Sequence, residues 1–114
     1  MPLFLTQVAY THEAWQAMIS NPQDRIEAIK PVLKKLGGKI INGYLSFGDY
    51  DTAAIVELPD TISAAAMAMA FAAGGACKNV KTTPLMTTAE GIDALKKAAN
   101  SGYRPVTAAA AAGR

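Results

Sequence analysis

The only histidine and the only tryptophan of this 114-residue chain, His12 and Trp15, stand three positions apart. They lie where a predicted strand gives way to a predicted helical turn, a common place for a ligand cleft, so both are ligand-binding candidates. The alternative is that His12 is a solvated or capping side chain and that Trp15 packs in the core. Because no second histidine, thiol pair or carboxylate cluster accompanies His12, we expect no metal site and no cofactor.

A second group of reactive side chains, Gly48-Asp49-Tyr50-Asp51, lies between two predicted strands. Two carboxylates and a phenol could serve acid–base chemistry. The same residues also suit a hairpin: Gly48-Asp49 fits a two-residue type II′ turn, tyrosine favours strands, and Asp51 can accept hydrogen bonds from backbone amides near the turn. We therefore interpret these four residues as a structural hairpin motif.

The elements that must position these residues follow from the hydrophobic periodicity. Strands alternate with two longer helices, and an extra amphipathic helix and an alanine-rich tail occupy residues 89–114. The order β-α-β-β-α-β is the split βαβ pattern of a ferredoxin-like α+β domain, with two helices on one face of a four-stranded antiparallel sheet, here over residues 1–88. The predicted strands are 3–10, 39–47, 50–58 and 78–86, and the predicted helices are 22–36 and 61–73.

The geometry expected for this sheet separates the two groups of candidates. If the strand over residues 3–10 runs parallel to the strand over 50–58, its C-terminal end lies away from the hairpin. Strands of about eight residues at roughly 3.3 Å per residue then put about 25 Å between His12 and the hairpin carboxylates. We expect no pairing of His12 with Asp49 or Asp51 inside one protomer.

The strand over residues 39–47 alternates cleanly and predicts a polar face that includes Asn42 and Tyr44. Their side chains should point away from the helices. If a second sheet packs against this face, Asn42 and Tyr44 line an interior with a few polar groups among apolar ones, which is typical of a small-molecule pocket. They join His12 and Trp15 as ligand-binding candidates.

The helix over residues 61–73 is apolar on every side and carries no charge. Helices of this kind are normally covered all round. One face should pack on the sheet of its own protomer and the opposite face on something else, either the extra helix at Ile92 and Leu95 or a neighbouring subunit. Placing Met67 and Phe71 on the second face makes them interface candidates.

Composition limits the class of protein. The net charge of +2, with scattered basic residues, gives no footprint for nucleic acid. The longest apolar stretch falls short of the roughly 20 residues that span a bilayer, and the N-terminus lacks the features of a signal peptide, so we expect a cytoplasmic protein without a membrane partner. The single cysteine, Cys77, is expected to pack without forming a disulfide inside the chain.

The stretch around the hairpin resembles the GYD-domain family of small bacterial and archaeal proteins. The residues that carry the resemblance include Gly37-Gly38-Lys39, the run 44–51 and the run 55–60, with Gly48, Tyr50 and Asp51 as the glycine, tyrosine and aspartate of the name. It spans about residues 2–88. The family is similar to ferredoxin-like groups that pair their sheets into a dimeric α/β barrel, so the resemblance implies a fold and a self-association but no reaction.

Two functions remain open from the sequence. The first is a homodimeric or larger module that binds a small, mostly apolar ligand or a protein partner. It is favoured because no nucleophile–base pair, metal set or phosphate loop is found. The alternative is a cofactor-independent enzyme, of monooxygenase or isomerase type, acting on a small aromatic or lactone-like substrate. It rests on analogy of fold alone.

Overall fold

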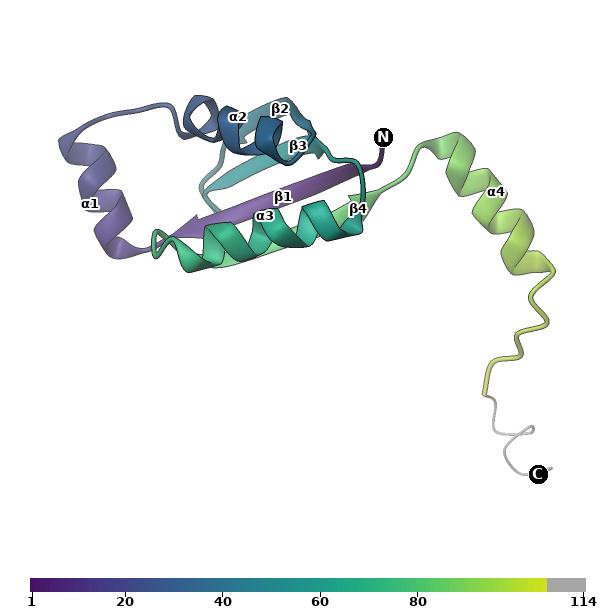
Figure 1. Cartoon of the computed structure of the whole chain (residues 1–114). Coiled ribbons are helices and arrows are strands. Elements are labelled where there is room, and N and C mark those ends of the chain that lie inside the picture. The colour runs from purple at the N-terminus through teal and green to yellow at the C-terminus, as the bar shows by residue number, and fades with distance from the viewer. Residues whose placement is uncertain (107–114) are drawn as a thin grey trace.

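The computed structural model describes residues 1–106, which form an α+β fold around a four-stranded antiparallel sheet (Figure 1). The strand order is β2-β3-β1-β4, and every neighbouring pair is antiparallel. The sequence therefore predicted the four strands and one antiparallel sheet, but not the relative direction of the first and third strands. The strands are β1 (Leu3–Tyr10), β2 (Lys39–Leu45), β3 (Thr52–Glu57) and β4 (Cys77–Leu85).

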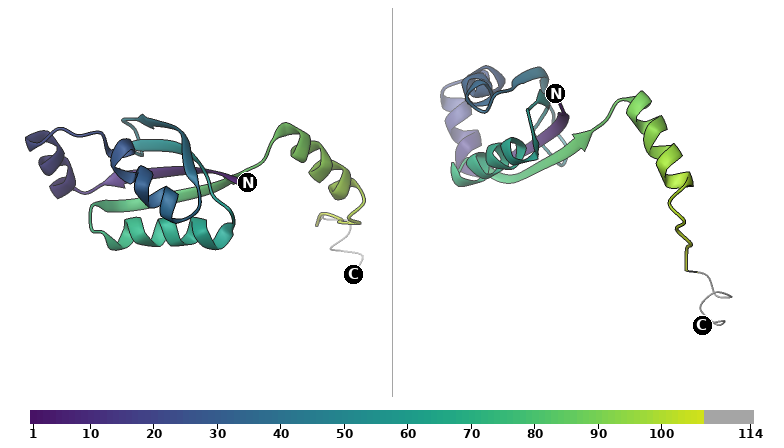
Figure 2. Two further views of the ribbon diagram at one scale, coloured as in Figure 1. Left: turned by 45° about the horizontal axis from the view of Figure 1, so that its top comes forward. Right: turned by 45° about the vertical axis from the view of Figure 1, so that its right-hand side comes forward.

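Four helices occur in the described part of the chain: α1 (His12–Ser20), α2 (Arg25–Lys35), α3 (Thr61–Ala73) and α4 (Thr88–Ala99). The views in Figure 2 show α2 and α3 along one face of the sheet, α1 standing off one end, and α4 projecting from the other end. The alanine-rich tail from residue 107 lies outside the described residues.

The core lies between the sheet and the helices α2 and α3. On β3, and on β1 as far as Val8, every second side chain is buried, as expected for a sheet with one covered face. The largest fully buried side chains are Leu33, Val56, Leu58 and Met67.

The placement of Met67 and Phe71 at a subunit interface was wrong. Met67 is 0% exposed in the core of its own protomer, and Phe71 packs against the same cluster. Both lie on the sheet-facing side of α3. The side that is left free carries Ile62 and Met69, which are 81% and 70% exposed.

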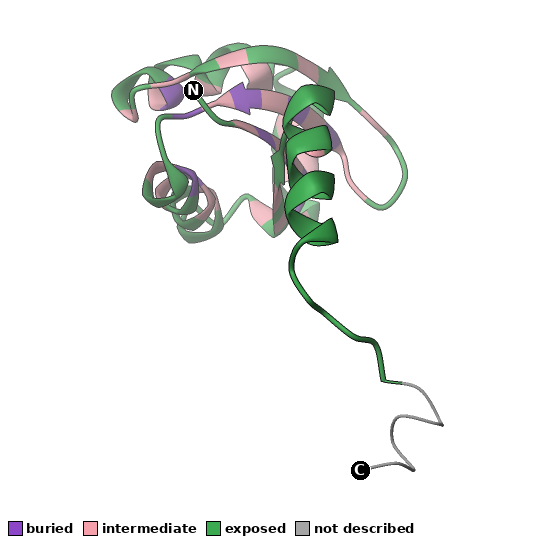
Figure 3. Ribbon diagram, turned by 90° about the vertical axis from the view of Figure 1, so that its right-hand side faces the viewer, coloured by how far each residue is buried: buried purple, intermediate pink, exposed green. Residues whose placement is uncertain are grey.

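The extra helix does not cover this free side. Figure 3 shows α4 exposed along nearly its whole length, and none of its residues is buried. Its start is nevertheless well defined, because the Thr87 and Glu90 side chains form a reciprocal capping box with each other's backbone amides. Its large apolar side chains, Ile92 and Leu95, are both exposed.

The expected 25 Å separation between the end of β1 and the hairpin was also wrong. β1 and β3 are antiparallel, with Val8 opposite Thr52, so the C-terminal end of β1 lies beside the start of β3. The cause is the split βαβ topology itself, in which β3 is inserted between two mutually parallel strands and must run against both. The hairpin and the β1–α1 junction therefore share one end of the sheet.

The hairpin itself is wider than a two-residue turn. Residues 46–51 separate β2 from β3, and the Ser46 backbone N–H donates to the Asp51 carbonyl oxygen at 2.8 Å. A type II′ turn needs a positive φ at its first central residue, and Gly48 does not have one. The prediction of that turn type was therefore wrong.

On β2 a bulge between Ile40 and Asn42 changes which side chains face the helices. Ile40 lies opposite buried Val56 and packs against the core, although strict alternation would put it on the same face as Asn42 and Tyr44. Beyond the bulge, Asn42 and Tyr44 lie opposite Ile55 and Ala53, on the open face of the sheet. Their predicted direction, away from the helices, is confirmed.

Candidate functional site

The best candidate site is a concave region beside α1. In Figure 1, α1 stands off from the rest of the fold at one end of the sheet. Its wider part, the outer hollow, has a volume of about 970 Å³. The walls come from α1, the connection to α2, the start of α2, and the adjoining ends of β2 and β3. They include Trp15, Met18, Ile19, Ile26, Tyr44 and Leu45.

A smaller inner cavity of about 60 Å³ lies between the helix-facing side of the sheet and the helices α2 and α3. Its lining is almost wholly apolar and includes Val8, Ile26, Ile29, Ala54 and Phe71. Ile26 and Thr52 line both the inner cavity and the outer hollow. The two spaces therefore adjoin.

Thr6 places a polar atom at the wall of the inner cavity. The side chain lies on the helix-facing side of β1 and is only 3% exposed. Its Oγ1 atom is buried and has no hydrogen-bond partner, and the same holds for Thr82 Oγ1 on the facing strand. A buried hydroxyl without a partner is costly, so this atom is an open position for hydrogen bonding.

Arg25 stands at the meeting point of these spaces. It lines the outer hollow, the inner cavity and a third recess of about 200 Å³ beside Tyr10 and Met18. The side chain is partly buried and donates one hydrogen bond, from Nη1 to the Gln23 Oε1 atom at 2.8 Å. The ion pairs among residues 1–106 join Lys30 to Glu27 and Lys39 to Glu57, and Arg25 takes part in neither.

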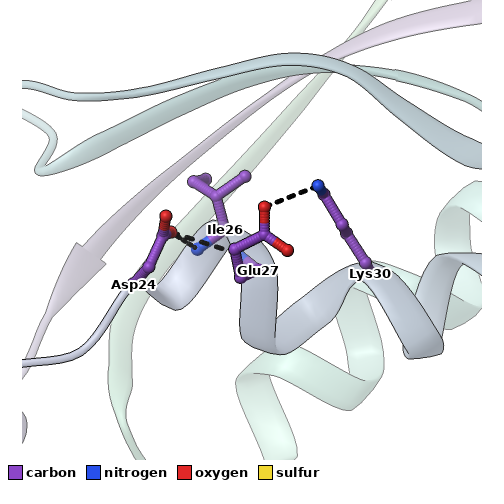
Figure 4. A network of polar contacts seen from close by, with 4 residues as sticks. All are labelled: Asp24, Ile26, Glu27 and Lys30. Atoms are coloured by element: carbon purple, nitrogen blue, oxygen red, sulfur yellow. Dashed lines mark hydrogen bonds and ion pairs between the residues drawn. The ribbon is translucent and has the colours of Figure 1, made fainter.

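The start of α2 holds Arg25 in this place. Asp24 caps the helix, because its Oδ1 atom accepts from the backbone N–H groups of Ile26 at 2.9 Å and Glu27 at 3.1 Å (Figure 4). The helix can lie close to β2 because Gly43 has no side chain; a Cβ there would come within 2.8 Å of Ile26. The position of Arg25 thus follows from a cap and a close packing contact.

The Cys77 thiol lies close to this cation. Partial burial raises the pKa of Cys77, and the nearby positive charge of Arg25 acts in the opposite direction. Burial has the larger effect on the pKa, so the Cys77 thiol is protonated at neutral pH. Cys77 therefore contributes a small apolar surface to the inner cavity and no activated nucleophile.

The far wall of the site is the base of α1. Thr11 caps this helix, and its backbone N–H donates to the Ala76 carbonyl oxygen at 2.9 Å, which ties α1 to the residue directly before β4. The Tyr10 and Trp15 rings meet edge to face with centroids 5.6 Å apart. Trp15 is thereby held at the wall of the outer hollow.

The hairpin motif supports this wall. Asp51 Oδ2 accepts from the Tyr10 backbone N–H at 2.8 Å, and the Asp51 N–H donates to the Val8 carbonyl oxygen at 2.8 Å. The Tyr50 hydroxyl accepts from Asn79 Nδ2 at 3.3 Å. Tyr50 and Asp51 therefore fasten the hairpin to β1 and β4, whereas Gly48 and Asp49 are exposed at its tip.

The four candidates taken from the sequence divide into two pairs. Trp15 and Tyr44 line the outer hollow, whereas His12 and Asn42 do not, and both of the latter are exposed. The sequence analysis missed Arg25 and Thr6. A lone arginine in an amphipathic helix and a threonine in a strand carry no local signal, because their significance comes from elements that meet only in the folded chain.

Two further findings concern the described residues. No three histidine, cysteine, aspartate or glutamate side chains among them gather closely enough to hold a metal ion. No helix in this part of the chain combines the length and the apolar character needed to cross a membrane.

Comparison with known proteins gave one result. A family model described as GYD domain matches residues 4–95, which reach from β1 into α4. Neither the search of curated proteins nor the search of solved structures found a match.

Proposed function

The chain belongs to the GYD domain family, and on that basis we propose that it is the subunit of a self-associating cytoplasmic module that binds a small, mostly apolar molecule. The observation that carries the proposal is the outer hollow, which opens next to the inner cavity and has a mainly apolar lining. Such concavities with few polar groups are typical of small-molecule sites. A protein partner at the same hollow is the other form of the proposal.

The self-association rests on the open face of the sheet. Helices cover only one face, and the opposite face carries large, at least partly exposed apolar side chains from three adjacent strands: Leu3, Leu5, Ile55 and Leu85. Adjacent apolar side chains on an uncovered sheet face are typical of an interaction site. A ferredoxin-like subunit that pairs this face with a second copy would form a dimeric α/β barrel.

Trp15 provides the test of binding because it is the only tryptophan and lines the outer hollow. The neutral probe N-phenyl-1-naphthylamine should bind the protein and quench the Trp15 emission by energy transfer. Met18→Asp, which puts a charge on the hollow wall, should weaken this binding at least tenfold. Met69→Asp makes the same change on the free side of α3 and should leave it unchanged.

Self-association calls for its own experiment. Sedimentation of the wild-type chain should give a dimer or larger species, and Leu5→Glu on the open sheet face should shift it toward the monomer, because a buried unpaired carboxylate is costly. A wild-type chain that sediments as a monomer at micromolar concentration would remove this part of the proposal.

The enzyme alternative finds less support in the geometry. The four ligand-binding candidates predicted from the sequence do not converge, since His12 and Asn42 lie outside the hollow that Trp15 and Tyr44 line. Binding without turnover therefore describes the site better than catalysis.

A further inference from the structure

We propose that the molecule held in this site is a carboxylic acid with an apolar body, and that Arg25 binds its carboxylate group. This inference rests on the proposed binding function and adds the chemical class of the ligand. It follows from the hydrogen-bonding state of Arg25, from the carboxylates around it, and from the unpartnered Thr6 hydroxyl.

Most N–H donors of Arg25 form no hydrogen bond in the described part of the chain. A guanidinium presents five N–H donors in a planar fork, and in the described chain only one hydrogen bond is formed, to the neutral Gln23 amide oxygen. The side chain is partly buried and borders three mostly apolar spaces. A cation in such surroundings is stabilised most by an anion that can accept two parallel hydrogen bonds, and a carboxylate has that geometry.

Residues 1–106 do not supply this anion. The carboxylates that line the outer hollow are Asp24 and Glu27. Asp24 accepts two backbone hydrogen bonds as the cap of α2, and Glu27 pairs with Lys30 at 2.6 Å (Figure 4). No carboxylate lines the inner cavity or the third recess.

The apolar walls indicate the rest of the ligand. Trp15, Met18 and Ile19 offer an aromatic and aliphatic surface on one side of Arg25, and Leu45 adds to it from β2. The inner cavity is less than half the roughly 150 Å³ that admits benzene, so it accepts only a short group of a few atoms. The ligand body therefore lies in the outer hollow.

Thr6 gives the second, independent sign of a ligand. Its hydroxyl is buried at the wall of the inner cavity and lacks a partner. A short oxygen-bearing group of the ligand that enters this cavity would complete its hydrogen bonding. An entirely apolar molecule would leave both Arg25 and Thr6 unsatisfied.

Three eight-carbon compounds that differ only in the head group separate the ligand classes: octanoate, 1-octanol and octylamine. Each is titrated against the full chain with Trp15 emission and displacement of N-phenyl-1-naphthylamine as readouts. We expect octanoate to bind at least tenfold more tightly than 1-octanol, because charge-assisted hydrogen bonds are the stronger kind, and octylamine to bind most weakly.

The variants assign the preference to one residue. Arg25→Gln should reduce the preference of octanoate over 1-octanol to within twofold. Arg25→Lys, which keeps the charge but loses the fork, should retain an intermediate preference. Arg104→Gln makes the same arginine-to-glutamine substitution at an exposed position beyond α4 and should behave as wild type.

Equal binding of octanoate and 1-octanol, or a preference that survives in Arg25→Gln, overturns the assignment of a carboxylate to Arg25 and leaves the proposed binding function standing. If neither the probe nor any of the three compounds changes the Trp15 emission, the binding function itself is refuted, and the ligand class with it.

Discussion

The unpartnered hydroxyl of Thr6 leads to a prediction about stability. In Thr6→Val a methyl group replaces the hydroxyl and the branched shape is kept. Because Thr6 is 3% exposed and its Oγ1 has no partner, the folded state bears the desolvation cost of that hydroxyl, about 1–3 kcal/mol, without a compensating hydrogen bond. Thr6→Val removes this cost. Taking its lower bound, the free energy of unfolding should rise by about 1 kcal/mol, and for a domain of this size the melting temperature should rise by about 4–8 °C.

The assay is thermal and urea unfolding of the ligand-free chain, followed by circular dichroism. Thr83→Val is the matched control, because Thr83 lies opposite Leu5 on the open face of the sheet and is not among the buried unpartnered hydroxyls. Its stability should change by less than about 0.5 kcal/mol. If Thr6→Val is no more stable than wild type, the hydroxyl has a partner in solution and does not indicate a ligand.

Three further predictions follow from contacts in the fold. Phe71→Glu should unfold the chain, because Phe71 packs against the core, whereas Met69→Glu on the exposed side of the same helix should leave the melting temperature within a few degrees of wild type. Asp51→Ala should cost about 1–3 kcal/mol in urea unfolding, because the Tyr10 N–H loses its acceptor; an unchanged stability would contradict the role given to Asp51. Cys77 should react with iodoacetamide at half its maximal rate only at a higher pH than an unperturbed cysteine thiol, since burial raises the pKa of Cys77, and reducing agent should not change the melting temperature; faster reaction near neutral pH would show an activated thiol.

The sequence was sufficient for the four strands and for helices α2, α3 and α4, because these elements depend on local periodicity. It was not sufficient for the relative direction of β1 and β3. The alternation of buried and exposed residues along β1 and β3, and the glycines that follow α2 and α3, are local signals. The direction in which Asn42 and Tyr44 point followed from the same alternation. The bulge at Ile41 shows where this reasoning ends, since one additional residue reverses the faces on one side of it without any change in composition.

The site was harder to predict from the sequence because its residues are distant from one another along the chain. Thr6, Arg25 and Cys77 come from three different elements, and nothing in the spacing of these residues indicates that they line one cavity. The face of α3 that packs inward was likewise beyond the sequence. A helix that is apolar all round has no polar side to indicate which of its faces meets the sheet.

The antiparallel course of β1 and β3 links the hairpin motif of the family to the ligand site. Because the hairpin lies beside the end of β1, Asp51 can hold the Tyr10 backbone, and the Tyr10 ring in turn packs edge-on against Trp15. Trp15 and Arg25 both line the outer hollow. If the outer hollow binds the proposed ligand, the aspartate of the motif acts as a positioning residue, through two contacts and without touching the ligand. On this reasoning a loss of the Asp51 carboxylate loosens the α1 wall, and its effect on binding should appear for octanoate and 1-octanol alike, in contrast to the head-group selectivity that depends on Arg25.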